Sequence, residues 1–173
     1  MSTPATVVVS ESNGAGPATM TDGITNLNFG SIDAANMVAA DHPLVIPVAG
    51  SIYSYFKCTR WKVTAWVDTN LIDNLKWFKS AGANAANWSE RYASVSRAYV
   101  TPDRTLAGPG GSVDTAGPWP TTAGTAIAIN GSIATPTIGY NGDNYAMHGV
   151  TITSSTVAGL KGSHTVTYRY DES

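Results

Sequence analysis

Glycine and proline interrupt this chain at short intervals, and this limits the elements that the chain can form. The sequence holds 17 glycines and 9 prolines among 173 residues. β-Branched residues dominate the apolar stretches between them. Proline breaks helices, and β-branched side chains favour strands. The sequence therefore predicts many short strands and little helix.

Alternation of apolar and polar residues is clearest in the segments 52–67 and 73–79. In the first, Trp61 and Val63 fall on one face. In the second, Leu75, Trp77 and Lys79 share a face. A period of two is typical of a half-buried strand. These two strands are expected to pair as a hairpin that supplies aromatic residues to the core.

Further strands are predicted on either side of this pair, separated by turn residues. Residues 44–48 contain Pro47 and are expected at an edge or a strand end. Residues 88–100 fit a helix face or a strand, and the β-rich neighbours favour the strand. The remaining predicted strands are residues 6–10, 24–29, 125–130, 134–140, 145–154 and 162–170.

This many short strands predict a mostly β fold. We expect an antiparallel β-sandwich of immunoglobulin-like or jelly-roll type. The length fits a single domain over residues 1–173. Its irregular parts are expected to be an extended N-terminal segment, 1–23, and a long Gly/Pro-rich loop, 101–124.

Charged residues are scarce, at 13% of the sequence, and the formal net charge is −2. A surface poor in lysine and glutamate loses little charge solvation when it is buried, which favours packing against copies of the chain or against a partner. The absence of a basic block argues against a nucleic-acid partner. The sequence offers no membrane span or signal peptide, so we expect a protein made in the cytoplasm.

The sequence indicates no catalytic, cofactor-binding or metal-binding residues. Cys58 is the sole cysteine and lies in an apolar run, so it is expected as a buried small residue. His42, His148 and His164 lack the spacing of metal ligands and are interpreted as polar surface or turn residues. No nucleophile elbow, phosphate-binding loop or dinucleotide motif is present. The protein is therefore expected not to be an enzyme.

The loop 101–124 is the segment most suited to a contact with another molecule. Long loops in compact domains are commonly disordered or used for binding. Trp119 lies between two prolines, so it could project as an interface anchor or pack locally within the loop. The candidate interface residues are Pro109, Pro118, Trp119 and Pro120.

Several segments of this chain resemble segments of small virion proteins of tailed bacteriophages. The resemblance is carried by residues 12–16, 24–31, 47–55 and 73–82, and by the ending 168–172 in style. It covers roughly the first half of the chain. It consists of turn and strand patterns, so it implies a structural component of the particle and no catalytic residues.

The resemblance implies a cement or decoration protein that stabilises the phage head by binding between capsid subunits. The expected partners are the major capsid protein, other virion subunits and further copies of this chain, as a trimer or larger homo-oligomer. The expected location is the virion, after assembly in the host cytoplasm. A tail-tube or head–tail connector protein is one alternative. A carbohydrate- or host-binding β-sandwich module is another.

Overall fold

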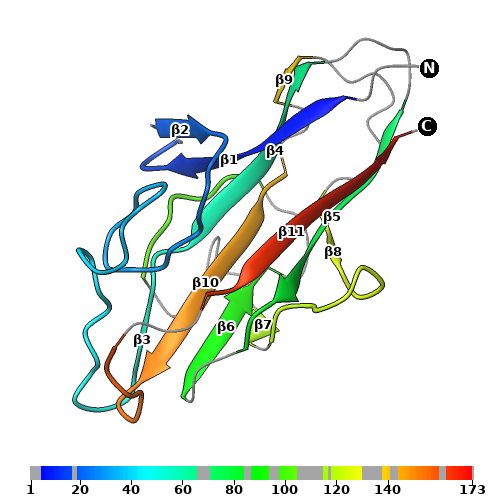
Figure 1. Cartoon of the computed structure of the whole chain (residues 1–173). Coiled ribbons are helices and arrows are strands. Elements are labelled where there is room, and N and C mark those ends of the chain that lie inside the picture. Colours follow the sequence, from blue (N-terminus) through cyan, green and yellow to red (C-terminus); the bar gives the residue numbers. More distant parts are fainter. Residues whose placement is uncertain are drawn as a thin grey trace.

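The chain folds into two antiparallel β-sheets that pack face to face (Figure 1). The computed structural model describes residues 5–16, 19–65, 71–83, 87–93, 98–104, 115–116, 118–129, 138–140, 144–159 and 163–172. Every regular element in these ranges is a strand. The expected antiparallel β-sandwich is confirmed. No helix in the described ranges is long and apolar enough to cross a membrane.

Within the described residues the first sheet has eight strands, and its main path runs β2-β1-β4-β10-β6-β7. Two short strands lie off this path, with β3 paired to β10 and β9 paired to β4. The strands are β1 (Thr6–Asn13), β2 (Thr19–Asp22), β3 (Ser51–Tyr53), β4 (Lys57–Ala65), β6 (Trp88–Tyr92), β7 (Thr115–Ala116), β9 (Gly139–Tyr140) and β10 (Ala146–Thr153). The described part of segment 1–23 therefore belongs largely to this sheet, as the β1–β2 pair.

The described part of the second sheet has three strands in the order β11-β5-β8. They are β5 (Ile72–Ala81), β8 (Ile127–Ala128) and β11 (Thr165–Glu172). The expected hairpin between the strands of Trp61 and Trp77 is wrong, because β4 and β5 lie in different sheets. β4 pairs with β1 and β10, whereas β5 pairs with β11. The two tryptophans enter the same core cluster from opposite sheets.

Aromatic rings fill the space between the sheets. Trp77 is fully buried and makes edge contacts with Tyr92 and Trp119, at ring-centroid distances of 5.8 and 5.9 Å. Trp61 makes edge contacts with Tyr168 and Tyr170 of β11. Such edge-to-face pairs add to the free energy gained by burying the rings. The main core is Ala5, Trp61, Val63, Ile72, Leu75, Trp77, Trp119, Ile129 and Ala146.

Two of the predicted strands are absent. Residues 24–29 are irregular, and the Asn36 side chain accepts hydrogen bonds from the backbone N–H groups of Thr25 and Asn26. Residues 44–48 are also irregular, which fits the missing N–H of Pro47. The other predicted strands form in part, with different ends. In the segment 134–140 only residues 138–140 are described, and in 88–100 residues 94–97 lie outside the described ranges.

Candidate functional site

Glu90 of β6 is the centre of a buried polar cluster that joins the two sheets. Its Oε1 accepts a hydrogen bond from Lys79 Nζ of β5 at 2.6 Å. Its Oε2 accepts one from the backbone N–H of Trp119 at 2.6 Å. The side chains of Glu90 and Lys79 are 0% and 7% exposed. The carboxylate therefore holds β5, β6 and the segment around Trp119 at fixed positions.

His164 completes this Glu90 cluster from the residue before β11. Its Nδ1 lies 3.2 Å from Glu90 Oε1, and its Nε2 lies 3.0 Å from the carbonyl oxygen of Ala83. Both ring nitrogens thus face acceptors. A neutral imidazole has one N–H and can donate to one of them, whereas an imidazolium donates to both. The ring also stacks on Trp88, with centroids 4.8 Å apart and planes 9° apart.

A second polar cluster lies deeper between the sheets and is built on His148 of β10. His148 Nε2 lies 2.8 Å from the hydroxyl oxygen of Tyr168 and 3.3 Å from Thr59 Oγ1. The two hydroxyl oxygens are 2.6 Å apart. The His148 ring contacts the Trp77 ring at 4.2 Å. This cluster links β4 and β10 of the first sheet to β11 of the second sheet across the core.

A hydroxyl beside an imidazole is also the arrangement of a nucleophile and its base. Here Thr59 and His148 are both 0% exposed. Burial lowers the pKa of His148 to about 3 and raises the pKa of the Tyr168 hydroxyl. The hydrogen bonds of these groups join β4 and β10 of the first sheet to β11 of the second.

The buried His148 ring makes the stability of the protein depend on pH. The pKa of a histidine in an unfolded chain is ~6.5, whereas that of folded His148 is about 3. As the pH falls below ~6.5, the unfolded chain binds a proton that the folded chain does not, so the folded state loses stability. From this residue alone, the free energy of unfolding should fall by about 2 kcal/mol between pH 7 and pH 5.

Urea denaturation at the two pH values measures this loss. His148→Gln removes the titrating ring, so its decrement between pH 7 and pH 5 should be about 2 kcal/mol smaller than that of the wild type. The comparison is made within each protein, so a general destabilisation by the substitution cancels. Equal decrements in the two proteins would show that His148 accepts a proton in the folded state.

A third buried cluster anchors the long irregular segment 31–50 to the first sheet. Lys57 Nζ of β4 donates to Glu11 Oε1 of β1 at 3.0 Å and to the carbonyl oxygen of Ala34 at 2.5 Å. Asn13 Nδ2 donates to Glu11 Oε1 and to Asp33 Oδ1, at 2.9 and 2.6 Å. Burial raises the pKa of Glu11, although Lys57 acts in the opposite direction. A buried ion pair of this kind fixes geometry more than it adds stability.

The segment 31–50 leads to an exposed apolar surface, which we call the apolar end and define by Val45, Val48 and Val157. Their exposed fractions are 74%, 103% and 70%. The segment and the loop after β10 run side by side at one end of the sandwich (Figure 1), where Ser154 N–H donates to the carbonyl oxygen of Gly50 at 3.0 Å. Residues 43–56 contain no Asp, Glu, Lys or Arg. The apolar end is therefore anchored, and its own segment holds no charged residue, although Arg104 Nε donates to the carbonyl oxygen of Tyr53 at 3.0 Å.

Of the two interpretations of Trp119, the one in which it projects from its loop as an interface anchor is wrong. Its side chain is buried, and its Nε1–H donates to the carbonyl oxygen of Arg91 at 3.0 Å. The flanking residues differ from it, since Pro118 is exposed and Pro120 is half-buried. Pro109 lies outside the described residues. Of the four candidate interface residues, Pro118 is thus the one with an exposed side chain among those described.

The buried ionisable residues were not identified from the sequence. His148 and His164 were expected at the surface or in turns, yet the side chain of His148 is 0% exposed and that of His164 5%. One signal was present, because Lys79 shares its strand face with Leu75 and Trp77 and therefore had to be buried with a partner. Cys58 is buried as expected, and burial raises the pKa of its thiol. Among the described residues, no three His, Cys, Asp or Glu side chains are placed to hold a metal ion.

The comparisons with known proteins give no relative. No protein-family model, curated protein or solved structure matches the chain. The likeness to phage virion proteins therefore stays a prediction from the sequence.

Proposed function

We propose that this protein is a non-enzymatic structural subunit of a virus particle. The first choice is a cement or decoration protein that binds between capsid subunits of a phage head. Two observations support the proposal. The ionisable groups of the three buried clusters are held in internal hydrogen bonds, and the surface offers an anchored apolar end.

The apolar end is the observation that carries the proposal. Large apolar side chains exposed together on a domain mark a binding surface for another protein. The segment that presents Val45 and Val48 is held by the Lys57–Ala34 hydrogen bond and by Gly50, so it is ordered before it binds. A preordered surface loses less entropy on binding. The absence of charged residues from the segment 43–56 suits an interface core, which is depleted in charged residues.

A particle-binding assay tests the proposal. Val45→Asp combined with Val48→Asp places two charges in the apolar end, so binding to particles that lack the protein should fall at least tenfold. The melting temperature should change little, because both side chains are exposed. Ile138→Asp is the matched control, since Ile138 is 67% exposed on the segment leading into β9, and it should bind like the wild type. Equal binding by the double variant and the wild type would show that the apolar end does not contact the particle.

Two further measurements separate the possible locations. Particles that lack the protein should lose resistance to heat or low salt if it cements the head, since each bound copy stabilises the assembled state. Labelling the protein in whole virions distinguishes the head from the tail tube or the head–tail connector. Unchanged particle stability together with a label on the tail would favour the tail alternative.

A carbohydrate- or host-binding module remains the third candidate. The projecting tryptophan on which it relied is buried in the core. Glycan-array binding by the purified protein would favour this candidate, and the absence of glycan binding would remove it.

A further inference from the structure

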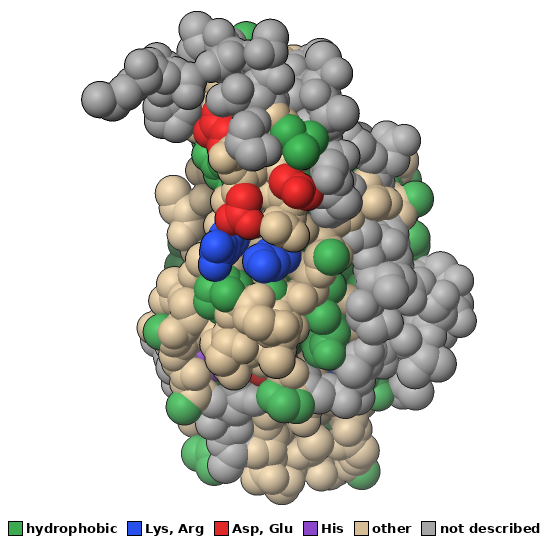
Figure 2. Space-filling model, turned by 90° about the vertical axis from the view of Figure 1, so that its right-hand side faces the viewer, with side chains coloured by type: hydrophobic (Ala, Val, Ile, Leu, Met, Phe, Trp, Pro, Cys, Tyr) green, Lys and Arg blue, Asp and Glu red, His purple; other side chains and the backbone are tan. Residues whose placement is uncertain are grey.

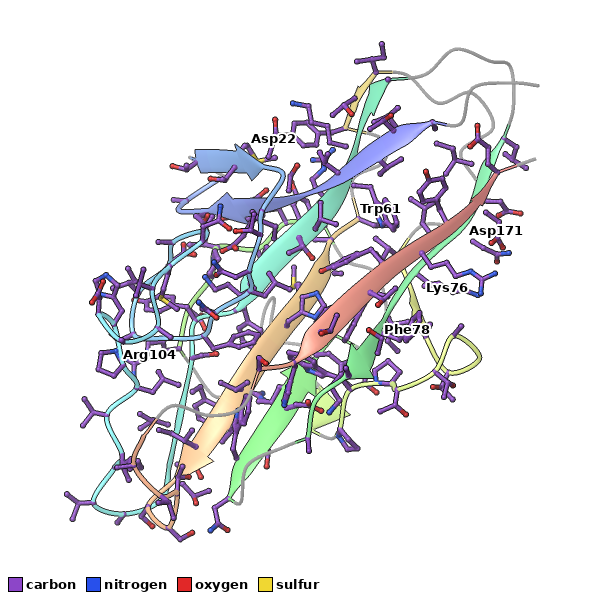
Figure 3. The ribbon with its side chains drawn as sticks, viewed as in Figure 1. Asp22, Trp61, Lys76, Phe78, Arg104 and Asp171 are labelled. Atoms are coloured by element: carbon purple, nitrogen blue, oxygen red, sulfur yellow. The ribbon has the colours of Figure 1, made fainter. Side chains whose placement is uncertain are left out.

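The outer face of the second sheet carries an ordered pattern of charges. On β5 the side chains that alternate with the buried Leu75, Trp77 and Lys79 belong to Lys76, Phe78 and Ser80. On β11, Arg169 and Asp171 have side-chain exposed fractions of 50% and 42%. Figure 3 shows Lys76, Phe78 and Asp171 along these two strands, and Figure 2 shows basic and acidic side chains gathered in adjacent groups on this side of the molecule.

The register of β5 and β11 places like charges opposite each other. Lys76 is the partner of Arg169, and Asp73 is the partner of Asp171. The second pairing depends on an irregularity, because the register shifts between Arg169 and Asp171 and Asn74 has a positive φ of 53°. Without that shift, Asn74 and not Asp73 would lie opposite Asp171. The face thus carries a basic row, Lys76 and Arg169, beside an acidic row, Asp73 and Asp171.

Like charges directly opposite each other on a sheet are destabilising. Part of this cost is offset within the chain. Arg169 Nη2 lies 3.2 Å from Asp171 Oδ1, and Asn74 Nδ2 donates to Asp171 Oδ2 at 2.8 Å. Among the described residues, no acidic side chain forms a salt bridge with Lys76, although its charge helps to lower the pKa of Asp171. An acidic group from outside the chain would therefore complete the basic row.

The two rows have opposite signs, equal numbers of charges and neighbouring positions along the same two strands. Consider a two-fold axis that lies parallel to the face and perpendicular to the strands, midway between the two rows. Rotation about this axis places the basic row of one copy over the acidic row of the other. It stacks β5 on β5 and β11 on β11 of a second copy. Lys76 then meets the partner's Asp73, and Arg169 meets the partner's Asp171.

We propose that this outer face is a self-complementary contact between two copies of the chain, with the basic row of each copy against the acidic row of the other. A second copy fits better than an unrelated partner because a two-fold contact must be its own complement, as this pattern is. Phe78, opposite Thr167 in the register, adds apolar area beside the basic row. The contact deepens the proposed function by naming a surface through which copies associate, and it rests on that function only for its role in the particle.

A charge-swap experiment on purified protein tests the contact. Lys76→Glu with Arg169→Glu gives an acidic-face variant, and Asp73→Lys with Asp171→Lys gives a basic-face variant. Sedimentation equilibrium at low salt should find the wild type associating as a dimer. Each variant alone should associate at least tenfold more weakly, because its two rows now repel their counterparts. An equimolar mixture of the two variants should form the dimer again.

A further control separates the effect of net charge from the effect of where the charges lie on the outer face. Asp22→Lys with Asp41→Lys has the same net charge as the basic-face variant, but its new lysines lie outside the outer face. Its own outer face is unchanged, so it should still form homodimers, but mixed with the acidic-face variant it should give no heterodimer. Lys76→Gln with Arg169→Gln is a milder change, which should also weaken wild-type association at least tenfold while the fold is checked by circular dichroism.

Several results would overturn the contact. They are a wild type that stays monomeric at millimolar concentration, variants that associate as strongly as the wild type, and a mixture of the two face variants that stays monomeric. These results leave the location of the protein in a particle unaffected. A failed contact is therefore distinguishable from a failed assignment to the virion.

Discussion

Glu90→Ala is expected to lower the free energy of unfolding by about 3–5 kcal/mol, which is the usual cost of removing one partner from a buried ion pair. The side chain of Glu90 is 0% exposed and accepts hydrogen bonds from Lys79 Nζ and from the backbone N–H of Trp119. The alanine variant leaves that ammonium and that N–H in the core without the carboxylate. Thermal melting should show a midpoint lower by roughly 10 °C.

The matched control is an ion pair at the surface. Lys62 and Asp22 form a salt bridge with side chains 28% and 40% exposed. Exposed pairs contribute at most about 1 kcal/mol, so Lys62→Ala should change stability by no more than that. Glu90→Gln keeps an acceptor for the Trp119 N–H and loses the charge. Its loss of stability should therefore lie between those of Lys62→Ala and Glu90→Ala. A Glu90→Ala variant as stable as Lys62→Ala would show that the Glu90 cluster does not hold the sheets together.

The strands that the sequence predicts best are those with strict alternation. In β5 the buried positions Leu75, Trp77 and Lys79 follow the predicted face. The segment 162–170 contains most of β11, although the strand runs to Glu172. These patterns are local, because each strand shows its buried face within a few residues. The strand content of the fold could therefore be predicted from the sequence.

The pairing of the strands could not be predicted in the same way. β4 pairs with β10, where Thr59 is opposite Ala146, and residues so far apart leave no pattern that links them. The predicted hairpin of β4 and β5 relied on closeness in sequence, which favours pairing but does not fix it. The buried clusters could not be predicted for the same reason, since Lys79, Glu90 and His164 meet only after both sheets have formed.

The like-charge rows on the outer face are also a consequence of register. Neither Lys76 nor Arg169 is unusual in its own strand, and the pairing of Asp73 with Asp171 depends on the shift beside Asn74. A one-residue change in register would place different side chains opposite each other. Surface patterns of this kind become visible only when the sheet is known.

Trp119→Ala is expected to be as damaging as the loss of Glu90, with a fall of about 3–5 kcal/mol in the free energy of unfolding. Trp119 is 2% exposed, and its ring contacts those of Phe29 and Trp77 at 5.7 and 5.9 Å. The alanine variant opens a cavity in the core and removes the hydrogen bond from Nε1–H to the Arg91 carbonyl oxygen. Urea denaturation of the dilute protein measures the change without any partner.

Two further variants separate a core role for Trp119 from an interface role. Trp119→Phe keeps most of the ring volume and should cost less than Trp119→Ala, whereas Pro118→Ala changes an exposed neighbour and should stay within about 0.5 kcal/mol of the wild type. Pro118 is the exposed residue next to Trp119 in the chain, so it serves as the local control. If Trp119→Ala kept wild-type stability but failed to bind particles, the tryptophan would be a contact residue, as one interpretation of the sequence predicted. A loss of stability in the isolated protein, with Pro118→Ala unaffected, places its contribution in the core.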